Sequence, residues 1–401
     1  MLLSLASRRY AINTLSKSMT ATGAAAALPS SLSSSSSSLT SSNTRLMTTH
    51  GFSGIQKVTV VGAGTLGTQV ALQTAITGHD VTVLDVSEDS LQNCRKNHEL
   101  ILQSFLEREQ DPSKVQARAW TNLTSSSSSS SNNGSKDAER VVQETLGRLM
   151  YTTDPAQAMD GCELVSENVP EVPEIKSSTY TTLTDHIISS NDNTQDIIFT
   201  TNSSTLLPSD FVDVLPEQYR SNFLALHFAN GIWDANIGEI MPHPGTDPAI
   251  TERVVNFAKD IRMVPFHILK EQNGYIINSL LVPWLNAAQT LVTNGVVQTP
   301  SEVDKAWLIS MGGYHHTDLS TIRAPFIVMD QIGVPLVANV LSYWGEVSND
   351  AQMTANGNYL QTHYVDHGKH GITNGNPSMC DPTEGIYSYP HPEYMNSDFM
   401  H

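Results

Sequence analysis

The chain has few cysteines and no long apolar run. Its three cysteines, Cys94, Cys162 and Cys380, lie far apart among 401 residues and form no C-x-x-C pair. This distribution indicates neither a disulfide framework nor a zinc or other metal site, and it suits a reducing compartment. The most apolar segment, residues 275–292, is interrupted by Asn, Ser, Pro and Gln. It therefore predicts a buried helix of a globular protein and no membrane span.

Basic residues are also scarce, because 22 Lys and Arg face 40 Asp and Glu for a formal net charge of −18. Such a charge argues against non-specific nucleic-acid binding through a basic face. All the acidic residues lie at Asp80 or later, whereas residues 1–50 are rich in Ser, Thr and Ala and include Arg8 and Arg9. This composition predicts a transit peptide for the mitochondrial matrix. A plastid signal and a merely disordered tail are the alternatives.

A glycine-rich turn follows the first apolar segment of the acidic part. Residues 57–61 predict a strand, residues 62–67 read G-A-G-T-L-G, and a helix and a second strand follow up to Asp85. Such a strand, turn and helix hold a pyrophosphate at the helix N-terminus, and an acidic residue about 20 positions on binds the ribose hydroxyls, which favours NAD over NADP. The alternative is a structural turn of another parallel sheet. The residues assigned to the cofactor here are Gly62, Gly64, Thr65, Leu66, Gly67 and Asp85.

The patterns further along the chain predict two domains. Residues 51–270 combine short apolar strands with helices, which is typical of an α/β, Rossmann-type, doubly wound and mostly parallel sheet. Two helical stretches, ending near Met150, predict a helical hairpin that carries a serine-rich insert at residues 124–133. A last strand is expected over residues 263–269, and residues 271–401 predict an all-helical domain.

A histidine stands at the end of a predicted strand. Oxidation of an alcohol by NAD needs a base for the hydroxyl proton, and His227 ends the apolar run Phe223 to His227. The carboxyl ends of parallel strands line the ligand crevice of such sheets. Glu239, expected to follow an intervening loop, can accept the other ring N–H. From the residues alone, a buried structural histidine is the equal alternative.

Five separated motifs together resemble the 3-hydroxyacyl-CoA dehydrogenase family over about residues 55–395. Besides the glycine turn with Asp85, they are E-N-V-P-E at 167–171, T-N-S-S-T-L at 201–206, H-F-A-N at 227–230 with Glu239, and G-Y-I-I-N-S-L-L-V-P at 274–283. The resemblance implies an NAD domain followed by a helical domain that forms a homodimer. It also implies oxidation of an L-3-hydroxyacyl-CoA, of short chain and of the kind found in fatty acid β-oxidation, to the 3-ketoacyl-CoA.

The resemblance also implies roles for single residues. His227 corresponds to the general base, Glu239 to its orienting partner, Ser204 to the serine that binds the reacting hydroxyl, and Asn278 to an asparagine from the second domain. Ser204 has the alternative of a turn cap and Asn278 that of helix packing. The further residues implied are, near the cofactor, Glu167, Asn168, Lys176 and Asn202, and, near the substrate, Asn230. For Lys176 the alternative is an exposed, solvated lysine.

Some segments depart from the family pattern. Gly231 replaces the usual proline after H-F-x-N, and the polar loop that follows contains Trp233. Residues 312–320 and 374–382 are further insertions. The loop after Gly231 is expected to border the acyl pocket. Two other functions therefore stay open: oxidation of a free hydroxy acid such as a sugar acid, and a non-catalytic, structural role for an NAD-binding protein.

Overall fold

The structure is a computed structural model that describes residues 53–110, 117–121, 123, 134–189, 196–311, 323–372, 384–389 and 392–400. The predicted transit peptide at 1–50 and the serine-rich insert at 124–133 lie outside these residues. The insertions at 312–320 and 374–382 and Cys380 also lie outside them.

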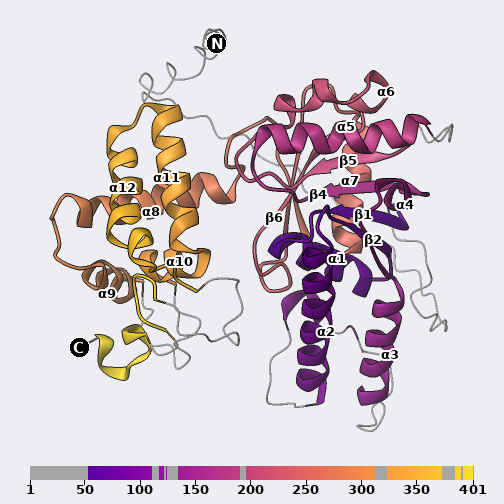
Figure 1. Cartoon of the computed structure of the whole chain (residues 1–401). Coiled ribbons are helices and arrows are strands. Elements are labelled where there is room, and N and C mark those ends of the chain that lie inside the picture. Colours follow the sequence, from indigo (N-terminus) through magenta and orange to yellow (C-terminus); the bar gives the residue numbers. More distant parts are fainter. Residues whose placement is uncertain are drawn as a thin grey trace, which may run out of the picture. The chain divides into compact units, whose positions relative to one another are not determined.

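One eight-stranded sheet organises the first part of the described chain (Figure 1). Its order is β3-β2-β1-β4-β5-β6-β7-β8, and all neighbours pair in parallel except β6 and β7. The predicted mostly parallel, doubly wound sheet is confirmed. The strands are β1 (Lys57–Val61), β2 (Asp80–Leu84), β3 (Leu149–Thr152), β4 (Leu164–Glu167), β5 (Ile198–Thr201), β6 (Phe223–Phe228), β7 (Ile237–Pro242) and β8 (Val264–His267).

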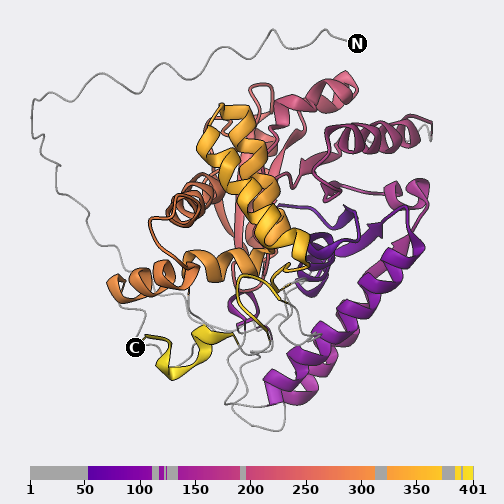
Figure 2. The ribbon, with the colours of Figure 1, turned by 60° about the vertical axis from the view of Figure 1, so that its left-hand side comes forward.

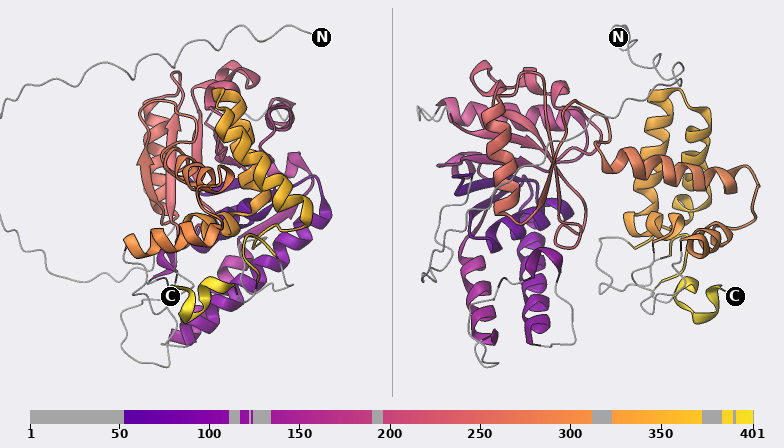
Figure 3. Two further views of the ribbon diagram at one scale, coloured as in Figure 1. Left: turned by 90° about the vertical axis from the view of Figure 1, so that its left-hand side faces the viewer. Right: turned by 180° about the vertical axis from the view of Figure 1, so that it is seen from behind.

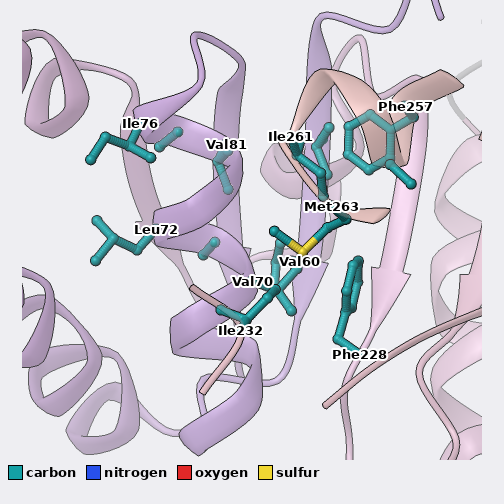
Figure 4. Packing of buried hydrophobic residues seen from close by; sticks show 14 of the residues in the cluster. Val60, Val70, Leu72, Ile76, Val81, Phe228, Ile232, Phe257, Ile261 and Met263 are labelled. Carbon is teal, nitrogen blue, oxygen red and sulfur yellow. The ribbon is translucent and has the colours of Figure 1, made fainter. Parts of the chain in front are cut away.

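Helices cover both faces of this sheet because its strand residues are apolar toward both. Val58 and Val60 of β1 belong to one core with α1 and α7, while Val61 belongs to a second core with α4 and α5. Successive strand side chains point to opposite faces, so one strand serves both cores. Figure 4 shows the first core, in which Val60 lies near Met263. The helices here are α1 (Thr65–Ile76), α2 (Glu88–Gln110), α3 (Gly134–Gly147), α4 (Pro155–Met159), α5 (Pro173–Ser189), α6 (Glu217–Arg220) and α7 (Pro248–Asp260).

The predicted helical hairpin is present as α2 and α3, which pack side by side (Figure 3). The prediction that its second helix reaches Met150 is wrong, because α3 ends at Gly147 and β3 begins at Leu149. Gly147 weakens the helix, and Tyr151 and Thr152 favour an extended strand that pairs with the edge of β2. A loop lies between His227 and Glu239, as expected, because β6 ends at Phe228 and Glu239 lies within β7, which begins at Ile237.

The second part of the described chain contains five α-helices and, as predicted, no strand among them. They are α8 (Ile277–Thr293), α9 (Pro300–Ser310), α10 (Pro325–Ile332), α11 (Val334–Ser348) and α12 (Ala351–His363). Helices α11 and α12 form the most extensive helix pair (Figure 2). No single helix of the described residues is long and apolar enough to cross a membrane. Helices α10 and α11 meet that test only as a pair, and a bend of 103° separates them.

Two buried carboxylates fasten the C-terminal segment to these helices. Asp304 of α9 accepts the hydroxyl of Tyr387 at 2.8 Å and the backbone N–H of Phe326 at 3.0 Å. Asp330 of α10 accepts the N–H of Tyr387 at 2.9 Å and the hydroxyl of Tyr389 at 3.0 Å. Burial raises the pKa of Asp304 to about 7 and that of Asp330 to about 6, against the hydrogen bonds that lower them. The segment around 384–389 therefore depends on two acids that titrate near neutrality.

The raised pKa values predict that stability falls as the pH rises. An acid whose pKa is raised by folding contributes stability below its unfolded-state pKa and loses it as the pH passes the folded-state pKa. From pH 5.5 to 8, the urea midpoint should fall more in the wild-type protein than in Asp304→Asn, whose side chain does not titrate. Asp350→Asn, which alters the cap of α12, is the matched control and should keep the wild-type difference. An Asp304→Asn protein with the wild-type difference would contradict the assignment.

Candidate active site

The glycine turn between β1 and α1 has the backbone that a pyrophosphate requires. Gly62 has a φ of +97°, and a Cβ atom there would lie 2.7 Å from the carbonyl oxygen of Asn168. A Cβ at Gly67 would lie 1.9 Å from the carbonyl oxygen of Gly62, so only glycine lets α1 pack against the turn. Gly64 is the N-cap residue of α1, and no side chain caps this helix. Its N-terminus, at Thr65 and Leu66, is therefore available to an anion.

Asp85 lies just beyond the end of β2, beside this turn. Its carboxylate accepts the N–H of Ala63 at 2.7 Å and that of Ser87 at 2.9 Å. The strand order changes direction between β1 and β4, which is where such sheets bind a dinucleotide. A Cβ at Gly64 would meet nothing within 4 Å, so the turn has open space on the ligand side. These features fit NAD, which supplies the hydride acceptor when it is bound.

His227 and Glu239 face each other across the one antiparallel strand pair. They are register partners in β6 and β7, and His227 Nδ1 lies 2.7 Å from Glu239 Oε2. Their side chains are 6% and 1% exposed. A carboxylate can only accept, so Nδ1 carries the proton and the Nε2 lone pair of the neutral ring is free to take one. Both ring nitrogens thus have a partner, Glu239 on one side and Ser204 on the other.

Glu239 also joins the sheet to the start of α8. Its Oε1 accepts the backbone N–H groups of Ile276 at 2.8 Å and Ile277 at 2.9 Å. Burial alone would raise the pKa of the Glu239 carboxyl, but these hydrogen bonds and the one from His227 hold it below its ordinary value. The carboxylate is therefore ionised at neutral pH, and the N-terminal end of α8 favours that charge.

Ser204 lies on the other side of the imidazole. Its Oγ is 3.1 Å from His227 Nε2. The neighbouring Ser203, not Ser204, caps the turn, since Ser203 Oγ accepts the N–H of Leu206 at 2.9 Å. Asn278, in the first turn of α8, donates from Nδ2 to the carbonyl oxygen of Ser204 at 3.4 Å. The four residues predicted to act on substrate thus come together from β6, β7, the turn after β5, and α8.

Tyr275 is a neighbour of this group that sequence reasoning did not single out. Its ring centroid lies 5.0 Å from that of His227, and its side chain is buried. It has a φ of +54°, a backbone conformation that is costly for a tyrosine. Burial raises its pKa well above the ordinary value, so the phenol is neutral. The position directly after Gly274 was the only sequence signal. Tyr275 covers the imidazole and limits its contact with water.

Asn202 and Asn168 brace the ends of three strands. Asn202 accepts the N–H of Phe228 at 2.8 Å and donates to Asn168 Oδ1 at 2.7 Å. These bonds fix the end of β6 beside the turn that follows β4. Both residues lie at the edge predicted for the nicotinamide. Asn230, predicted to contact substrate, is exposed just after β6.

Glu167 and Lys176 lie inside the protein. They are 0% and 1% exposed and form an ion pair with an Nζ–Oε1 distance of 2.8 Å. The exposed-lysine alternative for Lys176 is therefore wrong. A side chain without exposed surface makes no direct contact with a ligand in this conformation, so direct cofactor contact is not supported for these two. Lys176 also pairs with Glu171, whose Oε2 lies 3.3 Å from Nζ and whose side chain is 36% exposed.

The loop after Gly231 is held by the first helix and by the connection before the serine-rich insert. Gln69 of α1 accepts the N–H groups of Gly231 at 2.9 Å and Ile232 at 3.3 Å. Trp233 lies against Trp120, with ring centroids 5.2 Å apart. The departure from the family pattern thus replaces a proline-containing turn by one fixed through Gln69 and two tryptophans.

The part of the chain that the structure describes has no cluster of three His, Cys, Asp or Glu side chains placed to hold a metal. Cys94 and Cys162 are free and buried, and burial raises the pKa of each thiol to about 11. Neither thiol is a thiolate at neutral pH.

The comparisons with known proteins agree with this geometry. The model of the 3-hydroxyacyl-CoA dehydrogenase NAD-binding domain matches residues 57–272, and that of the C-terminal domain of the same enzymes matches residues 274–379. The chain belongs to the 3-hydroxyacyl-CoA dehydrogenase family. It is accordingly an oxidoreductase, and NAD is its cofactor.

Three relatives show the range of this family. The mitochondrial hydroxyacyl-coenzyme A dehydrogenase of Rattus norvegicus is 27% identical over 293 residues, which are 73% of this chain and 81% of the relative. Lambda-crystallin of Oryctolagus cuniculus is 27% identical over 62% of this chain and 67% of its own. A solved diketoreductase, described as catalysing dicarbonyl compounds, is 35% identical with a TM-score of 0.64, over 84% of this chain and 99% of its own.

Proposed function

We propose that this protein oxidises the 3-hydroxyl of a short L-3-hydroxyacyl-CoA to the 3-ketone, with NAD as hydride acceptor, in a fatty acid β-oxidation type of reaction. The observation that carries the proposal is the pair of contacts made by His227. Its Nδ1 lies 2.7 Å from Glu239 Oε2, and its Nε2 lies 3.1 Å from Ser204 Oγ. Membership of the family and the named mitochondrial relative support the thioester as substrate.

The proposed chemistry follows from the protonation states. His227 Nε2 removes the hydroxyl proton as the carbon loses hydride, and the Glu239 carboxylate stabilises the imidazolium that results. Ser204 Oγ–H donates to the same substrate oxygen, and the Asn278 amide reaches the cleft from α8. Both donors are neutral, so they stabilise a developing negative charge without holding the product as an ion pair. In the reverse direction the imidazolium returns its proton to the ketone oxygen.

A second candidate is reduction of a dicarbonyl compound that is not a CoA ester. It is favoured by the 35% identity to the diketoreductase and by the loop after Gly231, which departs from the usual family pattern. Oxidation of a free hydroxy acid belongs with this candidate, because it too needs no CoA contacts. A purely structural role, as lambda-crystallin illustrates by name, does not require that His227, Glu239 and Ser204 converge.

A substrate comparison separates these functions. Residues 51–401 should oxidise NADH rapidly with acetoacetyl-CoA, and kcat/KM should be at least ~100-fold lower with free acetoacetate, because the thioester's remote binding energy is lost. A diketo ester that carries no CoA is the third substrate, and absorbance at 340 nm is the readout. A preference for the diketo ester over acetoacetyl-CoA would overturn the CoA assignment. NADH binding without any turnover would favour the structural role.

We also propose a homodimer formed through the helical domain. Leu336, Tyr343 and Val347 of α11 are 50%, 42% and 59% exposed, and their spacing places them on one face of the helix. Leu280 of α8 is 69% exposed. A second copy of the chain would cover such surfaces, which a monomer rarely leaves open.

A dimer of residues 51–401 should show, in light scattering after gel filtration, twice the mass of one such chain. The full chain of 401 residues has a mass of 43.7 kDa. The double variant Leu336→Glu with Val347→Glu should elute as a monomer, because two charges cannot be buried unpaired at an interface. Leu100→Glu, at an exposed leucine of α2, is the matched control and should stay dimeric. A double variant with the mass of the wild type would exclude this face.

For localisation we propose the mitochondrial matrix. The acid-free composition of residues 1–50 and the mitochondrial name of the rat relative support it. Residues 1–50 fused to a fluorescent protein should direct it into mitochondria, and a plastid or cytosolic signal would contradict the proposal.

A further inference from the structure

The turn that carries Ser204 is held by one carboxylate oxygen from another strand end. Glu171, in the segment after β4, accepts through Oε1 the N–H groups of Ser204 at 3.1 Å, Thr205 at 3.0 Å and Leu206 at 3.3 Å. The same oxygen accepts the hydroxyl of Thr205 at 2.8 Å and that of Ser203. Consecutive N–H groups that converge in this way form an anion-binding concavity. Here the anion belongs to the protein itself.

We propose that Glu171 is a positioning residue that holds Ser204 Oγ against His227 Nε2. The inference rests on the proposed function, since it concerns the serine that binds the reacting oxygen. Glu171 binds the backbone N–H of Ser204 and the hydroxyl of Ser203, and it leaves the hydroxyl of Ser204 to the imidazole. The hydroxyls of the two neighbouring serines thus have different partners, Glu171 for Ser203 and His227 for Ser204.

A cation makes this arrangement possible. Lys176 Nζ lies 3.3 Å from Glu171 Oε2 and 2.8 Å from Glu167 Oε1, and its side chain is 1% exposed. Glu167 in turn accepts the hydroxyls of Thr201 at 2.8 Å and Tyr180 at 3.0 Å. Partial burial would raise the pKa of Glu171, but the charge of Lys176 and the hydroxyls of Ser203 and Thr205 hold it below its ordinary value. Glu171 is therefore an anion at neutral pH.

The other supports of the turn are neutral side chains. Asn273 donates from Nδ2 to the carbonyl oxygen of Thr205 at 2.8 Å. The Tyr275 hydroxyl donates to the carbonyl oxygen of Leu206 at 3.4 Å. Both come from the segment just before α8, and both bind carbonyl oxygens. The N–H groups of Ser204 and Thr205 donate to Glu171, whereas that of Leu206 also donates to Ser203 Oγ at 2.9 Å. Loss of its charge should loosen the side of the turn that faces His227.

The test compares Glu171→Gln and Glu171→Ala with the wild type in acetoacetyl-CoA reduction. A shift of about 1 Å in a reacting group can cost ~100-fold, so kcat should fall roughly 10- to 100-fold in Glu171→Gln and further in Glu171→Ala. The dissociation constant for NADH, measured by fluorescence, should change less than about threefold. Glu163→Gln is the matched control: its carboxylate also accepts two backbone N–H groups, at 2.6 and 2.8 Å, at the other end of the sheet. It should keep the wild-type kcat.

The pH profile separates positioning from mere structure. In the wild type, kcat should fall on the acid side as Glu171 is protonated. Lys176→Met removes the cation that lowers the pKa of Glu171, so this fall should move to higher pH. In Glu171→Gln the corresponding limb should be lost. A Glu171→Gln enzyme with wild-type kcat and profile, or with unchanged kcat and lost NADH affinity, would overturn the role. A wild-type protein without turnover would instead contradict the proposed function.

Discussion

The active site depends on one hydrogen bond across an antiparallel strand pair. In an otherwise parallel sheet, only the reversal between β6 and β7 makes residues that are twelve positions apart direct partners, and this places Glu239 against His227. The carboxylate fixes which ring nitrogen carries the proton, so the other faces Ser204 as an acceptor. Without the reversal, the end of β6 would offer a histidine of undefined tautomer.

The same carboxylate links two parts of the fold. Glu239 is ionised because it binds His227 through one oxygen and the first N–H groups of α8 through the other. The start of α8 brings Asn278, and Tyr275, two residues before this helix, covers the imidazole. In the role proposed for it, Glu171 orients the turn that carries Ser204, as Glu239 orients the ring of His227. In the proposed mechanism, these two anions, each stabilised by its own donors, orient the groups that face one substrate oxygen.

The sequence was sufficient for features that are local or that have strict steric requirements. The turn at Gly62 and Gly67 is one, because no Cβ fits there, and the apolar runs of β1 and β6 are others. It was insufficient where partners are distant. The burial of Lys176 follows from carboxylates that converge only in the folded chain, so its pattern resembled that of an exposed lysine. Strand β3 was missed because its residues continue a helical pattern and only pairing with β2 decides its state.

The central claim is that His227 takes the hydroxyl proton, and single-turnover kinetics test it most directly. The His227→Gln protein, mixed with NADH and acetoacetyl-CoA, should bind NADH as the wild type does and lose hydride transfer by at least ~1000-fold, because general acid–base catalysis contributes on this scale. His243→Gln changes another buried histidine, which bonds to the carbonyl oxygen of Arg220 at 2.9 Å, and should leave the rate unchanged. Wild-type hydride transfer in the His227→Gln protein would contradict the account.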